Sequence, residues 1–428
     1  MLDAIRKLLL SIGKRAEGIE TLRSLRRLAV MLVKHERGVA GAIEDISSIA
    51  EKHAVEVNSW LSPEEIVAGK GGRFDACSLR AWLAIAERAA VPAVPARVVL
   101  ELSENEMSVA SGTVVLPEGA LRRRLGAKIR AWIEASGADI PEQDAEPDVE
   151  DVVEKLAAAM DEVPEGWMVR HDRCGPESLK ALAGCGVAGP TAPEVRFGPE
   201  LEVGPGWVRV GNRRRIDAGD KRFVRGYAEG SSGGPSVFLA RPWVAASRWT
   251  SAEDPHRHGS RFAGKGFWPA EWRAFVENGE CIGVSAYYAW AGVLSKEAAE
   301  AALKVRELAR KLIDEVKAMN AIPSDVGVEL LRDSPHFAET LARFPKDAIA
   351  CTIDFIETKD GILLLEAGPA FSKIGGGHPC GFAGLDKPEG VAISVMPGVS
   401  LADPRTWTET DRTGRILSWE EIEAVAAA

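Results

Sequence analysis

DAIACTIDFIETKDGILLLEAGPAF, residues 347–371, has the residue pattern of an apolar β-hairpin. Residues 349–356 are rich in β-branched and apolar side chains and predict one strand. Lys359-Asp360-Gly361 supplies a turn, and residues 362–365 predict the antiparallel return strand. We expect this hairpin to lie in the core of a mixed α+β protein.

Two carboxylates face each other across the predicted hairpin. Asp354 precedes the centre of the turn by six residues and Glu366 follows it by six, so strand pairing places both on one face of the sheet. Unpaired acids in apolar surroundings would repel and raise each other's pKa, whereas a hard cation such as Mg²⁺ between them removes that cost. We therefore expect Asp354 and Glu366 to bind a metal ion. The alternative is that one of them is an exposed residue at a strand end.

A second hairpin is predicted just upstream, in PAEWRAFVENGECIGVSAYY, residues 269–288. Asn278-Gly279 is a strong two-residue turn signal, and the apolar run that follows predicts the return strand. Glu271 and Arg273 are two residues apart and so share one face of the first strand. An acid beside an arginine suits an anionic ligand, because the guanidinium binds phosphate oxygens. A structural ion pair is the alternative.

The rest of the chain predicts helices and short strands around these hairpins. Apolar residues spaced three and four apart predict a helix over residues 295–319, with Ser295 as its cap. Residues 1–90 have helical spacing, and residues 97–119 predict a small β-hairpin. DIPEQDAEPDVED, residues 139–151, has two prolines and seven acids, which is typical of a linker. We expect a mainly helical N-terminal domain with a β-hairpin over residues 1–138, separated by this acidic linker from the rest.

Composition narrows the classes of function. The 428 residues carry 53 Lys and Arg against 63 Asp and Glu, a net charge of −10, which argues against non-specific binding of nucleic acid over the whole surface. The six cysteines are far apart and lack zinc-site spacing, which indicates thiols in a reducing compartment. No run reaches about 18 apolar residues, so we expect a soluble, cytoplasmic protein. The common glycine-rich phosphate-loop patterns are missing from the sequence.

The order of short motifs over about residues 160–385 resembles the ATP-grasp superfamily. These motifs are the strand and hinge VFLARPWVAA, then E-x-R-x-F-V-x-N-G, then a long helix, and then D-F and D-G followed by L-L-E. The resemblance implies an ATP-grasp fold of two α+β lobes, the smaller over residues 152–240 and the larger, with the metal and ATP site, over residues 241–428. Mg²⁺ and ATP are the implied cofactors.

The resemblance also implies roles for individual residues. Asp354 and Glu366 match the Mg²⁺ ligands of the family, and Arg273, beside Glu271, matches the arginine that contacts phosphate and the transferring group. The hinge around Arg241 to Val244 would hold adenine, and the Arg241 side chain would assist at the phosphates. Arg170, in WMVRHD, stands where many members carry a phosphate-binding lysine, and an arginine there is similar to a phage-associated branch.

One position departs from the family pattern. Members usually have Asn two residues after the metal-binding Glu, whereas this chain has Gly368, so a carbonyl ligand for the metal is missing there. Water or Ser372 would then complete the Mg²⁺ shell, or the metal is bound more weakly.

The resemblance implies an ATP-dependent ligase that joins a carboxylate to an amine through an acylphosphate, with an amino acid or peptide as acceptor. The alternatives are a phosphotransferase that acts on a small molecule or nucleic acid, and a degenerate nucleotide-binding scaffold or sensor. The glycine run at residues 375–377, with Lys373 and His378 beside it, predicts either an anion-binding loop or a plain connector.

Overall fold

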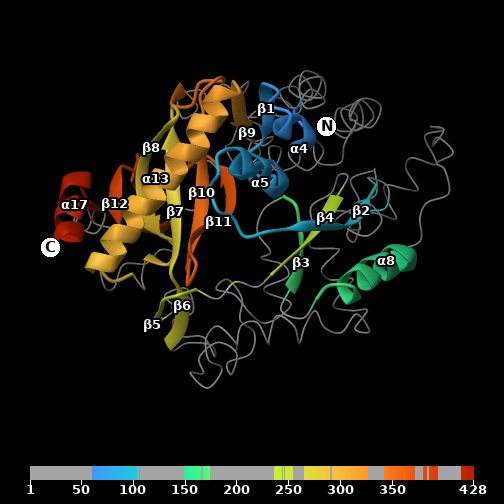
Figure 1. Cartoon of the computed structure of the whole chain (residues 1–428), viewed down its shortest axis with the longest axis horizontal. Helices are drawn as coiled ribbons and strands as arrows, with labels where there is room; N and C mark the ends of the chain where they lie inside the picture. The colour runs from blue at the N-terminus through green and yellow to red at the C-terminus, as the bar shows by residue number, and fades with distance from the viewer. Residues whose placement is uncertain are drawn as a thin grey trace, which may run out of the picture.

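The computed structural model describes residues 60–103, 106, 149–164, 167–173, 236–242, 244, 246–253, 265–289, 292–325, 342–371, 379–382, 385–393 and 416–428. These residues form an α+β fold with four β-sheets (Figure 1). The helices expected within residues 1–59 and most of the hairpin expected over residues 97–119 lie outside this part of the chain. So does the glycine run at residues 375–377.

The large sheet contains both predicted hairpins. Its strand order is β11-β10-β7-β8-β12-β13, with β12 parallel to β8 and the other neighbours antiparallel. The strands are β7 Glu271–Glu277, β8 Glu280–Ala286, β10 Cys351–Thr358, β11 Gly361–Pro369, β12 Gly390–Ala392 and β13 Ile416–Leu417. Asn278 and Gly279 have φ values of 50° and 76°, as the predicted two-residue turn between β7 and β8 requires.

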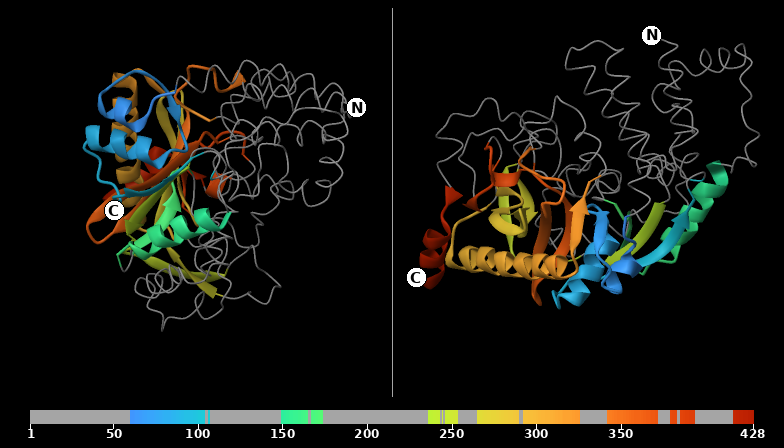
Figure 2. Two further views of the ribbon diagram at one scale, coloured as in Figure 1. Left: turned by 90° about the vertical axis from the view of Figure 1, so that its right-hand side faces the viewer. Right: turned by 90° about the horizontal axis from the view of Figure 1, so that it is seen from above.

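One long helix covers one face of the large sheet. Helix α13, Lys296–Ala318, lies along that face (Figure 2) and contacts β7, β8, β10 and β11. The Oγ atom of Ser295 accepts a hydrogen bond from the backbone N–H of Ala298 at 3.2 Å, which confirms the predicted helix and its cap. The C-terminal helix α17, Trp419–Ala427, packs against α13, where the Arg306 guanidinium lies 3.9 Å from the ring centroid of Trp419.

A small three-stranded sheet lies beside the β11 edge of the large sheet (Figure 1). Its order is β2-β4-β3, and helix α8 packs on it. The elements are β2 Arg97–Leu102, α8 Val149–Asp161, β3 Trp167–His171 and β4 Ser236–Pro242. A separate two-stranded sheet pairs β5, Trp249–Glu253, with β6, Lys265–Pro269.

The structure corrects the predicted domain partition for residues 60–102. Strand β1, Gly72–Asp75, pairs in parallel with β9, Ala321–Ser324, and β2 pairs with β4. Helices α4, Pro63–Val67, and α5, Leu79–Arg88, bury their apolar side chains in the same core as α13. Strands β1 and β9 form a two-stranded sheet of their own, and β2 belongs to the three-stranded sheet. Residues 60–102 are therefore part of the same folded unit as the later sheets, because strand pairing and burial across the boundary outweigh sequence order.

Two further expectations bear on the chain's organisation. Helix α8 begins at Val149, so the predicted linker over residues 139–151 already contains the start of a helix. Within the described residues, the structure has no helix that combines the length and the apolar composition needed to cross a membrane.

Candidate functional site

The predicted hairpin over β10 and β11, which carries Asp354 and Glu366 and is called the acidic hairpin below, forms in the structure. Its register, however, has an unexpected origin. Asp354 and Glu366 are register partners in the β10–β11 ladder. The turn contains only Lys359 and Asp360, and a regular pairing from it would place Asp354 opposite Leu365. The register shifts between Asp354 and Phe355, and Leu365 is the residue without a partner on β10. This β-bulge brings Glu366 opposite Asp354.

The bulge decides which face of the sheet Glu366 occupies. Without it, Glu366 would pair with Ile353, whose side chain belongs to the apolar core with α13. With it, Glu366 shares the opposite face with Asp354. Arg273 on β7 is the register partner of Asp354, and Ser285 on β8 is the partner of Arg273. A polar row therefore crosses four strands on the face that α13 does not cover.

Arg273 and Asp354 form a buried, two-bonded ion pair within this row. The Nε and Nη2 atoms of Arg273 donate to Oδ1 and Oδ2 of Asp354, both at 2.6 Å. Burial alone would lower the pKa of Arg273, but the Asp354 carboxylate outweighs it and raises that pKa well above its ordinary value. The Arg273 guanidinium also lies 4.8 Å from the ring centroid of Tyr287. The arginine is held in one orientation.

Glu271 lies two residues from Arg273 on β7, as the sequence predicts, with Ile356 as its partner on β10. Its Oε2 atom accepts a hydrogen bond from the hydroxyl of Tyr288 at 3.1 Å. Burial raises the pKa of Tyr288 well above its ordinary value, and the Glu271 charge adds to this shift. Tyr288 therefore stays a neutral hydrogen-bond donor that fixes Glu271.

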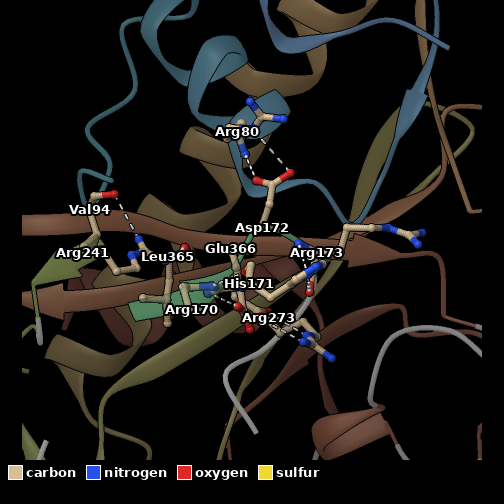
Figure 3. A network of polar contacts seen from close by, with 11 residues as sticks. Arg80, Val94, Arg170, His171, Asp172, Arg173, Arg241, Arg273, Leu365 and Glu366 are labelled. Atoms are coloured by element: carbon tan, nitrogen blue, oxygen red, sulfur yellow. Dashed lines mark hydrogen bonds and ion pairs between the residues drawn. The ribbon is translucent and has the colours of Figure 1, made fainter. Parts of the chain in front are cut away.

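The small sheet contributes two buried arginines to the same place (Figure 3). In the β3–β4 ladder Arg170 lies opposite Leu239 and Arg241 opposite Met168, so both arginines project from one face. The Nη1 atom of Arg170 donates to Oε2 of Glu366 at 2.7 Å. The structure thus brings together Arg170, Arg273 and the hairpin residues Asp354 and Glu366, which come from three separate segments of the sequence.

Arg241 does not pair with a carboxylate among the described residues. Its Nη1 atom donates to the carbonyl oxygen of Leu365 at 2.8 Å, and its Nη2 atom to that of Val94 at 3.0 Å. Its Nε atom has no acceptor in the described part of the chain. Burial lowers the pKa of Arg241 to about 9, and the neighbouring positive charge of Arg170 contributes. Val244 packs on a nearby apolar cluster.

Buried arginines compensate the negative charges of Asp354 and Glu366, which the sequence alone does not show. Each of them is paired with a buried arginine, so the repulsion between Asp354 and Glu366 is relieved without a metal ion. Within the described residues, no cluster of three or more His, Cys, Asp and Glu side chains could hold a metal. The pair still fits Mg²⁺, which uses one or two carboxylates together with phosphate oxygens and water. A carboxylate offers about four lone-pair positions, so it can bind a cation in addition to an arginine.

Sequence reasoning missed two residues that hold the site together. Tyr287 stacks on Arg273, and Asp172 fixes the end of β3. The Asp172 carboxylate accepts hydrogen bonds from the backbone N–H of Arg80 at 2.9 Å and from Ser78 Oγ at 2.8 Å, at the start of α5. Asp172 follows Arg170 by two residues, but no local spacing connects it with Ser78.

The comparisons with known proteins do not identify the chain. No family model matches the sequence, and no curated protein matches it. Among solved structures, Cdc123 from Schizosaccharomyces pombe aligns with a TM-score of 0.30 and 11% identity, over 85% of this chain and 93% of that chain. A C-terminally truncated form of that protein gives 0.31 and 11%, over 86% and 94%. Similarity at this level supports no assignment, so the functional argument depends on the site itself.

Proposed function

We propose that the protein is an ATP-dependent ligase of the ATP-grasp type, which joins a carboxylate to an amine. The observation that carries this proposal is the bond between Arg170 and Glu366, where a cation of the small sheet meets the acidic hairpin of the large sheet. The buried Arg273–Asp354 pair lies next to it. Such a site suits Mg·ATP, because arginines bind phosphate oxygens and carboxylates bind the cation.

The proposed reaction consists of two displacements. The carboxylate of the first substrate attacks the γ-phosphate of ATP, which forms an acylphosphate and releases ADP. The amine of the second substrate, an amino acid or peptide, then attacks the acyl carbon and releases phosphate. Both steps depend on positioning and charge neutralisation more than on a strong side-chain base, which agrees with a site made of arginines and carboxylates.

Each residue of the site has a role in this proposal. Asp354 and Glu366 would hold Mg²⁺, which when bound neutralises charge on the phosphates. Arg170 and Arg273 would bind the oxygens of the transferring phosphoryl group. Arg273 is already oriented by Asp354 and by Tyr287, so little side-chain freedom is lost when the phosphate binds. Glu271 lies on the same face as Arg273 and would help to align the acceptor.

An apolar wall beside the arginines would accept the adenine ring. Val94, Ala246 and Ile356 form a buried cluster, against which Val244, Leu363 and Leu365 pack. We place adenine at this wall, along the backbone of Arg241 and Val244. Nucleotide pockets combine such apolar surfaces with a few polar groups that fix orientation.

Two observations favour a second candidate function, a nucleotide-binding sensor or scaffold without catalysis. Gly368 lacks the amide oxygen that would add a metal ligand, and both carboxylates already have arginine partners. A phosphotransferase would use the same residues with a different acceptor. A phosphorylated acceptor without a new amide bond would distinguish it from the ligase.

The decisive experiment measures Mg²⁺-dependent ATP binding by calorimetry and turnover by phosphate release. We expect Glu366→Gln to reduce Mg²⁺-dependent turnover by about 100-fold. Glu357→Gln is the matched control, because Glu357 is also paired with an arginine, Arg248, but lies on the opposite face of β10 from Asp354. It should retain turnover.

Three outcomes separate the candidates. Loss of turnover in Glu366→Gln alone supports an ATP-using enzyme and makes a screen of amino acid and peptide acceptors worthwhile, in which a new amide bond would favour the ligase over the phosphotransferase. ATP binding without turnover for any acceptor favours the sensor. If the addition of Mg·ATP to the wild-type protein produced no heat of binding, the ATP-grasp interpretation would be wrong.

A further inference from the structure

The bulge at Leu365 has its own support from the small sheet. Leu365 has no partner in the register with β10, and its carbonyl oxygen accepts the 2.8 Å hydrogen bond from Arg241 Nη1. Arg241 is 1% exposed, whereas Leu365 is half-buried, so this bond is partly shielded from water. A carbonyl in such surroundings and outside the strand ladder needs a donor, because leaving it unsatisfied is unfavourable.

A second segment fixes the other side of this arrangement. The backbone N–H of Leu364 donates to the carbonyl oxygen of Pro92 at 2.8 Å, and the N–H of Val94 donates to that of Leu364 at 3.0 Å. Ala93 forms a parallel bridge with Leu364. Residues 92–94 therefore cover the outer edge of β11, and Arg241 Nη2 donates to the carbonyl oxygen of Val94 in the same segment.

Arg241 thus connects three pieces of backbone: its own strand β4, the covering segment and the bulged residue of β11. We infer that Arg241 is a positioning residue that stabilises the bulge at Leu365 and thereby keeps Glu366 on the face of Asp354. The geometry demands a forked donor here, since the two carbonyl oxygens belong to different segments. The catalytic consequence rests on the proposed function, but the structural part does not.

This role differs from a direct contact of the Arg241 side chain with phosphate. A phosphate contact would make Arg241 important only when nucleotide is bound. A positioning role makes it important for β11 in the free protein as well. The two roles therefore predict different results in the absence of ATP.

The first test is hydrogen–deuterium exchange of the free protein, with Arg241→Met and the matched control Arg248→Met. Arg248 pairs with Glu357 on β10 and does not contact the bulge. We expect faster exchange in peptides that cover β11 for Arg241→Met and unchanged exchange there for Arg248→Met. Unchanged exchange of β11 in Arg241→Met would overturn the inference.

The second test uses a deletion of Leu365. Deletion removes the bulge, and regular pairing from the two-residue turn then keeps Glu366 opposite Asp354. In the full-length chain, we expect Arg241→Met to raise the Mg²⁺ concentration needed for ATP binding by about 10–100-fold, the usual effect of losing a group that orients a metal ligand. In the deletion background the same substitution should have little further effect.

Full additivity of the two changes would overturn the inference, because it would mean that Arg241 acts on the nucleotide and not through Leu365. A wild-type protein that does not bind Mg·ATP would overturn the proposed function instead, and the exchange experiment would then decide the inference by itself. The exchange experiment also does not depend on whether the deletion variant folds.

Discussion

The site contains two arginine–carboxylate pairs that differ in almost every physical respect. Arg273 and Asp354 belong to neighbouring strands of one sheet, share two hydrogen bonds of 2.6 Å, and have side chains that are 9% and 3% exposed. Arg170 and Glu366 belong to different sheets, and Nη1 of Arg170 donates one hydrogen bond of 2.7 Å to Oε2 of Glu366. The Arg170 side chain is 2% exposed, but that of Glu366 is 20% exposed.

The difference separates a fixed pair from an adaptable one. A fully buried pair is hard to break, because removal of one charge leaves the other in a medium that cannot solvate it. A carboxylate that reaches solvent can exchange partners at a lower cost. We therefore regard Asp354 as the anchored carboxylate of the hairpin and Glu366 as the one that can reorganise when a ligand arrives.

The largest expected effect comes from breaking the fixed pair. Asp354→Asn leaves the Arg273 guanidinium buried without its counter-charge and should lower the free energy of unfolding by about 3–5 kcal/mol. Urea denaturation measures this change. The double replacement Asp354→Leu with Arg273→Met should recover most of the stability, because an apolar pair of similar volume replaces the ions. If the double variant were as unstable as Asp354→Asn, another contact of Asp354 would be responsible.

Breaking the adaptable pair, Arg170–Glu366, should lower the stability less than breaking the fixed pair. Glu366→Gln deprives the buried Arg170 of its counter-charge, but it keeps an amide oxygen that can accept from Arg170, and solvent reaches this side chain. We therefore expect a loss of about 1–3 kcal/mol in the same measurement, smaller than that of Asp354→Asn. Equal losses for Glu366→Gln and Asp354→Asn would break the comparison between the two pairs. A large loss of ATP turnover together with a small loss of stability in Glu366→Gln would strengthen the distinction between the two pairs.

Tyr287 adds a smaller amount of stabilisation, and only to the Arg273–Asp354 pair. Tyr287→Leu removes the aromatic face from Arg273, while Tyr287→Phe retains it. We expect Tyr287→Leu to be less stable than Tyr287→Phe by about 0.5–1 kcal/mol, the usual strength of a cation–π contact. Thermal unfolding of both variants measures the difference. Equal midpoints would show that the ring contributes only packing.

The sequence predicts the hairpins, the long helix and its cap, because these depend on local patterns. Asn278-Gly279 specifies a two-residue turn by itself, and the three-and-four spacing before Met319 specifies α13. The strand with Arg170 is also visible as an apolar run. These features need no knowledge of distant residues.

Other features depend on contacts between distant residues. The facing of Asp354 and Glu366 was predicted from a symmetric turn, but it arises from a shorter turn followed by the bulge at Leu365. The bulge is supported by Arg241, which is 124 residues away in the sequence. The pairing of β1 with β9 and of β2 with β4 likewise joins segments that the composition assigns to different domains. Long-range pairing of this kind leaves no periodic signal.

A substitution at Gly368 can add a metal-binding group next to the adaptable carboxylate, Glu366. It lies opposite Thr352 on β10 and shares the face of Glu366, two residues away. Among the described residues, a Cβ atom there would meet only Thr352 Oγ1, at 3.4 Å, an ordinary contact distance. Gly368 is buried, so Gly368→Asn should lower the free energy of unfolding by up to about 1 kcal/mol.

The new amide oxygen would project beside Glu366, where the resemblance to the ATP-grasp superfamily places a further metal ligand. We expect Gly368→Asn to lower the Mg²⁺ concentration required for ATP binding by roughly tenfold, measured by calorimetry at fixed ATP. Gly368→Ala is the control, because it adds the Cβ atom without the oxygen. An improvement in both variants would indicate a backbone effect. An improvement in Gly368→Asn alone requires a cation next to Glu366, which would show that the adaptable carboxylate takes part in metal binding.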